Sequence, residues 1–390
     1  MELLPCRPMD NGRASASTLA TAGILLMLGL LYTSAGFYRL VGDVPGSFPV
    51  DLRLRWTESH LLADGRNTQR VGHPDPLLPD THKAMRLWGG SYPPWSYAFG
   101  LVFAPPVEWK PARLWFALLC FSALALVAWD GWQRGRPFGT TPALIAATLP
   151  FTNFSSAICL SYGQYGVLVT GLIVAAVRLL ESRRSGAAGA VLGFALVKPQ
   201  LAAAYCVAMA GSRRWRAVAG IAVTIVAGTM VMAMAVNEPA SAVASRAVVE
   251  MSYIHSSHNP LLNVATQVLH HRMVVPMLGL SGALLMWCVA MRGEGDAYRL
   301  ACLSVIVAMF WSYRKHFDAS LMSLPLIWLW LETCRTRRRG LAVLFAALGV
   351  TLWLPIRDAQ WELWWVAAAQ LAVWPAAAVV IARADRTPTA

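Results

Sequence analysis

The sequence predicts an all-α integral membrane protein, and three observations favour this fold class. The chain has 390 residues, of which 57% are hydrophobic and 14% charged, whereas soluble domains average about 45–50% apolar and about 25% charged residues. Its mean hydropathy is +0.49. Apolar runs of bilayer-spanning length recur along the chain, with short arginine-rich stretches between several of them. We therefore expect one polytopic membrane domain over residues 1–390.

About ten of the apolar runs have the length of a full transmembrane helix, which needs about 20 apolar residues. Two further segments fit less well. Residues 92–109 are short with proline pairs near both ends, and residues 187–210 carry Lys198 and Pro199 in their middle. We expect one or both of these to be re-entrant or short membrane segments. The predicted full spans cover residues 18–38, 111–130, 140–158, 165–181, 216–236, 273–291, 298–313, 318–333, 340–355 and 361–382.

The arginine-rich stretches predict how the chain crosses the membrane, because positive residues concentrate in cytoplasmic loops. If both weaker segments crossed fully, the basic stretches 130–138 and 212–216 would lie outside. If both return on the side they entered, the basic stretches all become cytoplasmic, and we favour this arrangement. The cytoplasmic set is then 131–139, 181–186, 211–216, 292–299, 334–340 and the tail at 383–386.

The opposite side then carries a first extracytoplasmic loop over residues 39–91, with an interfacial helix, and a second large loop over residues 237–272. Polar and ionisable residues collect on this side. Such one-sided clustering predicts a catalytic or binding cavity that opens towards the outer leaflet.

Lys198-Pro199-Gln200 interrupts an otherwise apolar run. Proline has no N–H and disfavours a helical residue before it, so a helix should end here. Lys198 would then lie at the apex of a re-entrant segment, where a water-filled cavity or an anionic partner must compensate its charge. The alternatives are a snorkelling lysine beside a proline kink and a full crossing with Lys198 deep inside the membrane.

Asp51 lies early in the first outer loop, within "FPVDLRLRW" (48–56). Apolar residues there alternate with Arg53, Arg55 and Glu58, which is typical of a helix lying on the membrane interface. A carboxylate at the mouth of a partly dry cavity can act as a general base. The alternative is that Asp51 caps the first turn of the helix.

Several cationic residues lie on three separate outer segments and could converge. An anionic ligand, most simply a phosphate, would compensate them together. A histidine taken alone is more often an ordinary loop residue. His255 and His258 have no identifiable third ligand, so we expect no metal site. The cationic set is Lys198, His255, His258, Arg314, Lys315 and His316.

Two further segments carry candidate sugar or acceptor contacts. Tyr92 begins "YPPW", and an aromatic ring beside a polar cavity can stack on a sugar. The alternative is an interfacial aromatic set at a helix start. Gln164 lies between glycines in "SYGQYG" (161–166), where its amide could bond a polar ligand or simply cap a turn.

Other function classes find no support. No GxxxxGK[ST] or GxGxxG sequence occurs, so nucleotide chemistry is not indicated. The seven cysteines form no CxxC pair, which indicates neither a disulfide framework nor a zinc site. The net charge of +13 resides largely in short loops between apolar runs, so we expect no nucleic-acid partner. No cofactor is expected.

Six stretches, in this order, resemble the polytopic GT-C glycosyltransferases, and more closely glycosyltransferase family 87, the polyprenyl-phosphate-mannose-dependent α-mannosyltransferases. The resemblance runs from about residue 15 to about residue 360. It is carried by "PVDLRLRW" with Asp51, "YPPWSYAFGLVFAPP", "SYGQYG", "LVKPQLA" with Lys198, "HNPLLN" with His258 and "RKHFDASLMSLPLI" with Arg314 and His316.

The resemblance implies a GT-C-like fold and an inverting sugar transfer without a nucleotide. Asp51 would deprotonate the acceptor hydroxyl, and Lys198, Arg314 and His316 would stabilise the departing polyprenyl phosphate. Tyr92, Gln164, His255 and His258 would orient the sugar or the acceptor.

We therefore predict a hexosyltransferase, most simply a mannosyltransferase, in the inner (plasma) membrane with its active site facing the periplasm or exterior. Its partners would be a polyprenyl-phosphate-linked sugar donor, a glycan or glycolipid acceptor, and the lipid bilayer. The alternatives are a transporter or flippase of a lipid-linked saccharide and a non-catalytic membrane scaffold.

Overall fold

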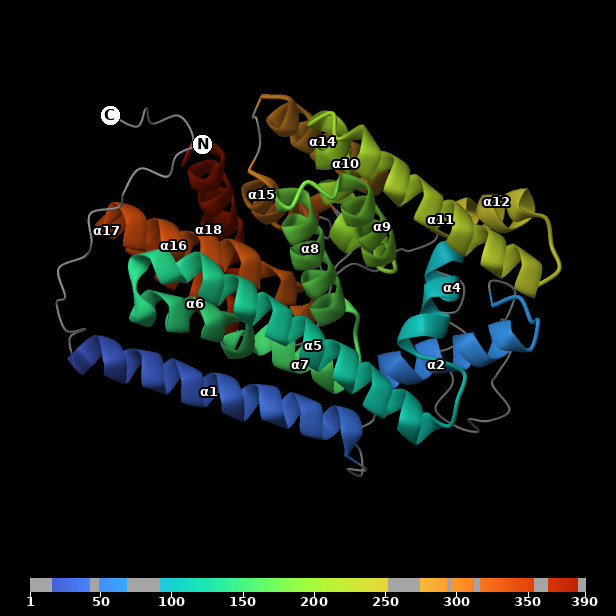
Figure 1. Cartoon of the computed structure of the whole chain (residues 1–390), viewed down its shortest axis with the longest axis horizontal. Helices are drawn as coiled ribbons and strands as arrows, with labels where there is room; N and C mark the ends of the chain where they lie inside the picture. Colours follow the sequence, from blue (N-terminus) through green and yellow to red (C-terminus); the bar gives the residue numbers. More distant parts are fainter. Residues whose placement is uncertain are drawn as a thin grey trace.

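A computed structural model describes residues 16–42, 49–68, 92–251, 274–292, 296–311, 316–353 and 364–384, and every element in these ranges is a helix (Figure 1). The elements are α1 (Ala16–Val41), α2 (Val50–Ala63), α4 (Pro94–Phe103), α5 (Trp109–Gly135), η1 (Arg136–Phe138), α6 (Thr140–Thr152), α7 (Phe154–Tyr162), α8 (Gly166–Glu181), α9 (Ser185–Ala195), α10 (Pro199–Gly211), α11 (Trp215–Ala235), α12 (Ala240–Met251), α14 (Val274–Arg292), α15 (Ala297–Trp311), η2 (His316–Met322), α16 (Ser323–Thr336), α17 (Arg339–Trp353) and α18 (Trp364–Arg383).

The all-helical prediction is confirmed for the described residues, but the count of about ten full spans is not. Each predicted span coincides with a helix or a helix pair. Within the described ranges, however, only α5 with η1 (30 residues) and α11 (21 residues) are long and apolar enough to cross alone, and α6 with α7 would make a third. Several helices are too short to cross alone. The 16 residues of α8 rise about 24 Å, less than the roughly 30 Å hydrocarbon core.

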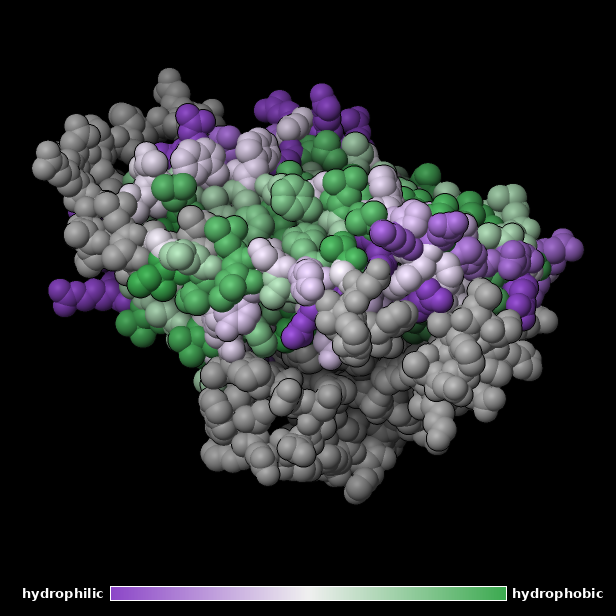
Figure 2. Space-filling model, turned by 90° about the horizontal axis from the view of Figure 1, so that it is seen from below, coloured by the Kyte–Doolittle hydropathy of each residue, from purple (hydrophilic) through white to green (hydrophobic). Residues whose placement is uncertain are grey.

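The surface indicates a membrane protein. Large apolar side chains are exposed along whole helices, as on α5 and α11. Figure 2 shows hydrophobic residues covering much of the middle of one face, with strongly hydrophilic residues mostly towards its edges. Contiguous exposed apolar surface of this extent is unfavourable in water, so the described helices indicate a lipid environment. Examples are Leu114, Leu118, Phe121, Val223, Val226, Met230 and Met234.

Small residues bring the helices into close contact. A Cβ placed on Gly189 of α9 would lie 2.0 Å from the Ala217 carbonyl oxygen of α11, and one on Gly193 would lie 2.4 Å from Thr224 Cβ. Such spacing lets backbones approach where lipid supplies no hydrophobic drive. While α9 packs against α8 and α11, α10 packs against α14 and α15, so the two halves of residues 187–210 have different neighbours.

Three of the predicted cytoplasmic loops are tight turns with one shared backbone feature. Arg183, Arg213 and Arg337 follow α8, α10 and α16, and each has a positive φ between 54° and 59°. A cation next to the last carbonyls of a helix is favoured by the helix dipole. The side of the membrane on which these turns lie stays a prediction.

The predicted span 140–158 is interrupted at Asn153, where α6 and α7 meet at a bend of 41°. The Asn153 amide oxygen accepts a bond from the Ser155 N–H at 3.0 Å and so caps α7. Its amide nitrogen donates to the Ala319 carbonyl at 3.1 Å. The Asn153 side chain therefore caps α7 at the bend and also holds η2, the element that carries Asp318.

The helix expected in the first outer loop is present as α2. Figure 1 shows α2 and α4 together at the end of the molecule from which α5 begins. Leu52, Trp56 and Leu62 of α2 are buried, and the Trp56 indole donates to the Val107 carbonyl at 2.7 Å. α2 is therefore packed into the protein along one side, and its position at the membrane interface stays a prediction.

Candidate functional site

The helix break at residues 196–198 positions Lys198. α9 ends at Ala195, Pro199 begins α10, and Lys198 between them has φ −127° and ψ 81°. The Leu196 carbonyl accepts bonds from the Trp95 indole at 2.9 Å and the Ser96 hydroxyl at 3.3 Å. The first turn of α4 thus satisfies a carbonyl at the break, and the "YPPWS" segment holds Lys198 in place.

The Lys198 ammonium is almost entirely buried and has two polar partners. Its residue is 2% exposed, and Nζ donates to Gln164 Oε1 at 3.0 Å and to Asp318 Oδ1. Asp318 is fully buried. Nζ also lies 4.8 Å from the centroid of the Phe317 ring. Because a buried charge is costly unless paired and hydrogen-bonded, Asp318 supplies the anionic compensation that the sequence required.

The turn at residues 163–165 connects this ion pair to α2. Gly163 ends α7 in the left-handed conformation, with φ 67°. A Cβ on Gly163 would lie 2.3 Å from Leu52 Cβ, so glycine is required by conformation and by space. Leu52 follows Asp51, and Gln164 follows Gly163. The structure therefore brings the first turn of α2 next to the residues that hold Lys198.

Asp51 is half-buried in that first turn. The N-cap position of α2 is Pro49 and shows no side-chain cap, so the capping interpretation is not supported. Among the described residues, the Asp51 carboxylate makes no hydrogen bond or ion pair.

Tyr92 lies between α2 and the lysine. The Arg55 guanidinium covers its ring at 4.4 Å from the centroid, and Tyr92 also interacts electrostatically with Lys198. Arg55 pairs with Glu58 at 2.7 Å. Burial raises the pKa of Glu58 to about 7, against the opposing effect of Arg55. One face of the predicted stacking ring is thus occupied by an arginine of the chain itself.

The structure unites some predicted site residues and leaves others outside its described ranges. Lys198 and Gln164 are bonded, and Tyr92 and the helix of Asp51 adjoin them. His255, His258, Arg314 and Lys315 lie outside the described residues, as does the side chain of His316, whose backbone begins η2. No cluster of three metal-binding side chains occurs in the part of the chain that is described.

Sequence reasoning missed Asp318 and the Arg55–Glu58 pair. Asp318 follows "RKHF" and precedes an apolar run, so it resembled the end of a polar turn. The available signal was electrostatic: a lysine in an apolar segment needs a carboxylate, and Asp318 borders another apolar segment. For Arg55 and Glu58 the signal was their spacing of three residues, which places them on one helix face.

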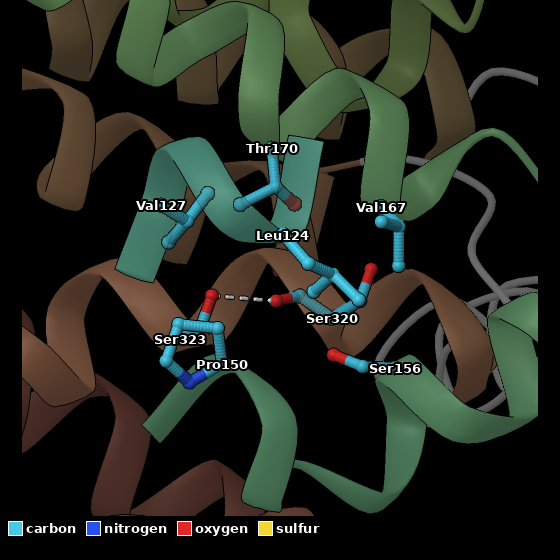
Figure 3. Close-up of a pocket in the computed structure, with 8 residues that line it drawn as sticks. All are labelled: Leu124, Val127, Pro150, Ser156, Val167, Thr170, Ser320 and Ser323. Atoms are coloured by element: carbon cyan, nitrogen blue, oxygen red, sulfur yellow. Dashed lines mark hydrogen bonds between the residues drawn. The ribbon is translucent and has the colours of Figure 1, made fainter. Parts of the chain in front are cut away.

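A small gap lies beside the site, between α5, α6, α7, α8 and the η2–α16 segment (Figure 3). The Ser323 hydroxyl donates to the Ser320 carbonyl at 2.9 Å across one side of it. The gap encloses about 180 Å³ between atoms yet has no room for a water molecule. It is a packing space beneath η2 and is too small for a sugar.

A second buried ionic cluster lies at the far end of α8. Asp130 is fully buried, and its two carboxylate oxygens contact Arg134 Nε at 2.9 Å and Arg178 Nε at 2.5 Å. Both arginines also contact Glu181, at 2.7 Å and 3.5 Å. We refer to Gln164, Lys198 and Asp318 as the lysine cluster and to these four residues as the arginine cluster.

Comparison with known proteins gives one match. A family model described as glycosyltransferase family 87 matches residues 91–324, more than half of the chain. Seven of the eight predicted site residues fall within this range, and Asp51 precedes it. A search of curated proteins found no match.

Proposed function

The chain belongs to glycosyltransferase family 87, and we propose that it transfers a hexose, most simply mannose, from a polyprenyl-phosphate carrier to an acceptor hydroxyl. The acceptor would be a glycan or glycolipid. The reaction would take place on the extracytoplasmic side of the inner membrane, in a GT-C-like arrangement of helices. The observation that supports this proposal is the close approach of Leu52 to Gly163, which brings the first turn of α2 next to the turn that carries Gln164.

Asp51 acts as the general base. Its carboxylate takes the proton of the acceptor hydroxyl, the acceptor oxygen bonds to C1 of the sugar, and the bond from C1 to the phosphate oxygen breaks. The electron pair leaves with the polyprenyl phosphate, so charge balances and C1 is inverted. The half-buried carboxylate without a partner among the described residues is suited to accept a proton.

Lys198, Arg314 and His316 stabilise the departing phosphate. An ammonium has three N–H donors, and the lysine cluster uses two of them, on Gln164 and Asp318. The third donor has no partner among the described residues and would be available to a phosphate oxygen. Asp318 keeps the ammonium charged and fixed before the donor arrives, which is the preorganisation that electrostatic catalysis requires. Tyr92, Gln164, His255 and His258 orient the sugar or the acceptor.

The test is transfer by purified protein from polyprenyl-phosphate-mannose to candidate glycan acceptors, comparing wild type with Asp51→Asn. Loss of a general base should lower kcat by about 10²- to 10⁴-fold. Asp64→Asn is the matched control, because Asp64 is an exposed carboxyl at the other end of α2 and should leave kcat unchanged. Full transfer by Asp51→Asn removes Asp51 as base. Movement of the lipid-linked sugar across liposomes without a new glycosidic bond would instead support a flippase.

A further inference from the structure

The polar face of α2 extends beyond Asp51. Asp51, Arg55 and Glu58 are spaced by four and three residues and therefore share one side of the helix. Glu58 is 6% exposed. Its Oε2 contacts Arg55 at 2.7 Å, but its Oε1 is buried without a hydrogen-bond partner in the described part of the chain. An unpaired buried acceptor costs about 1–3 kcal/mol, so this oxygen requires an explanation.

Tyr165 presents a second buried polar atom of this kind. The residue is 3% exposed, and its hydroxyl has no partner among the described residues. Its ring is held between Phe103 and Phe116, at centroid distances of 5.7 and 6.0 Å. Tyr165 interacts electrostatically with both Arg55 and Glu58. The two unpaired atoms therefore share one neighbourhood without bonding each other.

The two atoms are complementary to a hydroxyl. Above its pKa of about 7 the Glu58 carboxylate is ionised and its oxygens only accept hydrogen bonds, whereas a phenol can donate one. A ligand hydroxyl between them can donate to Glu58 Oε1 and accept from Tyr165 Oη, which satisfies both atoms at once. A ligand that offered only an acceptor, such as a phosphate, would leave Glu58 Oε1 unpaired.

The pair also lies next to the proposed reacting centre. Tyr165 directly follows Gln164, the partner of Lys198, and the Arg55 guanidinium stacks on Tyr92. Glu58 is seven residues from Asp51, or about 10 Å along the helix axis. A hydroxyl bound there belongs to the same saccharide as the reacting atoms, or to the one beside it, and is not itself the reacting hydroxyl.

We propose that Glu58 and Tyr165 form a hydroxyl-binding subsite that holds a sugar through a hydroxyl remote from the reacting atoms. This inference rests on the proposed hexosyl transfer. The donor sugar and a sugar acceptor both offer this chemistry. Arg55 is the positioning residue that orients the carboxylate, and the groups facing Glu58 are Arg55 on α2, Tyr97 on α4 and Tyr165 in the turn.

A cycle of ligand and protein changes tests the subsite without requiring turnover. Tyr165→Phe removes only the unpaired hydroxyl and keeps the ring contacts. We would titrate wild type and variant with methyl α-mannoside and its four monodeoxy analogues, using saturation-transfer NMR. One analogue should bind wild type about tenfold more weakly than the parent, as expected for one lost hydrogen bond to a charged group. The variant should bind the parent about tenfold more weakly and no longer distinguish that analogue.

The subsite is overturned if the parent glycoside binds wild type and Tyr165→Phe with equal affinity. It is also overturned if the affinity lost with the deoxy analogue and the affinity lost with Tyr165→Phe simply add. Either result assigns the space between the two unpaired atoms to water. Thermal unfolding should show no loss of stability in Tyr165→Phe, because no partner among the described residues is removed. A large fall in melting temperature would show that the hydroxyl is structural and would also contradict the proposal.

Transfer kinetics then identify which sugar is held. A rise in KM for polyprenyl-phosphate-mannose in Tyr165→Phe and Glu58→Gln assigns the subsite to the donor, and a rise in the acceptor KM assigns it to the acceptor. Tyr162→Phe is the control, because Tyr162 lies near the same turn but is 44% exposed. If the binding cycle gives the expected result but wild type transfers no sugar, the proposed function fails while the subsite stands. If wild type transfers sugar but the binding cycle does not give the expected result, the subsite fails while the proposed function stands.

Discussion

The lysine cluster and the arginine cluster lie at opposite ends of α8, and both bury a carboxylate completely. In the arginine cluster, Asp130 contacts two guanidinium groups, and Glu181 contacts both of them again. The arginine side chains are 19% and 28% exposed, so they also reach solvent. In the lysine cluster, a single ammonium that is 3% exposed faces one carboxylate and one amide.

In our proposal, this difference separates a structural network from a site that receives a ligand. The arginine cluster is neutral as a set and joins α5 to α8 through contacts within the chain. The lysine cluster lies at a helix break, beside a turn and a short 3₁₀ helix, and its ammonium has a third N–H without a partner among the described residues. Burial of charge alone therefore does not indicate a functional site, and our proposal rests instead on burial at interrupted backbone.

The largest effect is expected from Asp318→Asn. It leaves the buried Lys198 ammonium without its counter-charge, which should cost about 3–5 kcal/mol of stability and abolish transfer. Thermal unfolding and the transfer assay measure the two effects. The double variant Lys198→Met with Asp318→Leu should recover most of the stability but no activity. Asp318→Asn protein as stable and active as wild type would refute the compensation that defines the lysine cluster.

The lysine cluster's end of the protein should also be the pH-sensitive one, through Glu58. The folded protein raises the pKa of Glu58 from 4.5 to about 7, so it favours the protonated form. Its contribution to stability is therefore fully present below about pH 4.5 and is lost as pH rises through about 7. The loss is at most about 3 kcal/mol. Melting temperatures from pH 5 to 8 should fall in wild type and flatten in Glu58→Gln. Equal slopes of melting temperature against pH in wild type and Glu58→Gln would show that Glu58 is not the source of the pH dependence.

Gly163→Ala tests the contact between the first turn of α2 and the turn that carries Gln164. A left-handed alanine costs about 1–2 kcal/mol, and its methyl group would lie 2.3 Å from Leu52 Cβ, so we expect a total loss of about 2–3 kcal/mol. Because α2 must shift, transfer should fall about tenfold. Gly186→Ala meets no atom within 4 Å and should be neutral or stabilising. A wild-type transfer rate in Gly163→Ala would show that the reaction does not depend on the position of Asp51 relative to the lysine cluster.

The smallest effect is expected from Asp130→Asn in the arginine cluster. Arg134 and Arg178 keep Glu181 and their contact with solvent, so we expect a loss of about 1–2 kcal/mol. The kcat and KM of the folded fraction should not change. A drop in kcat without a drop in stability would show that the arginine cluster takes part in the reaction.

The positions of the helices could be predicted because apolar runs reveal where helices form. The ends of the helices depended on particular residues that hydropathy does not detect. Asn153 divides one predicted span by capping α7 and bonding η2. Pro199 is itself visible in the sequence, and the break beside Lys198 was accordingly predicted. The count of about ten crossings is not confirmed, because several described helices, such as the 16-residue α8, are shorter than a bilayer-spanning helix.

The site was partly predictable for a related reason. Lys198 and Gln164 stand out because each interrupts an apolar or glycine-rich context. Asp318 becomes recognisable only when its pairing over 120 positions is known, and sequence alone gives no distance between remote residues. Glu58 and Tyr165 become notable only because each has an atom that found no partner within the described chain.

The two bonds from Trp95 and Ser96 to the Leu196 carbonyl have a mechanical consequence. The carbonyl is two residues from Lys198 in the chain, so a shift in the opening turn of α4 would reach the backbone that positions the ammonium. In the proposed reaction, such a shift would change where this charge lies relative to the departing phosphate.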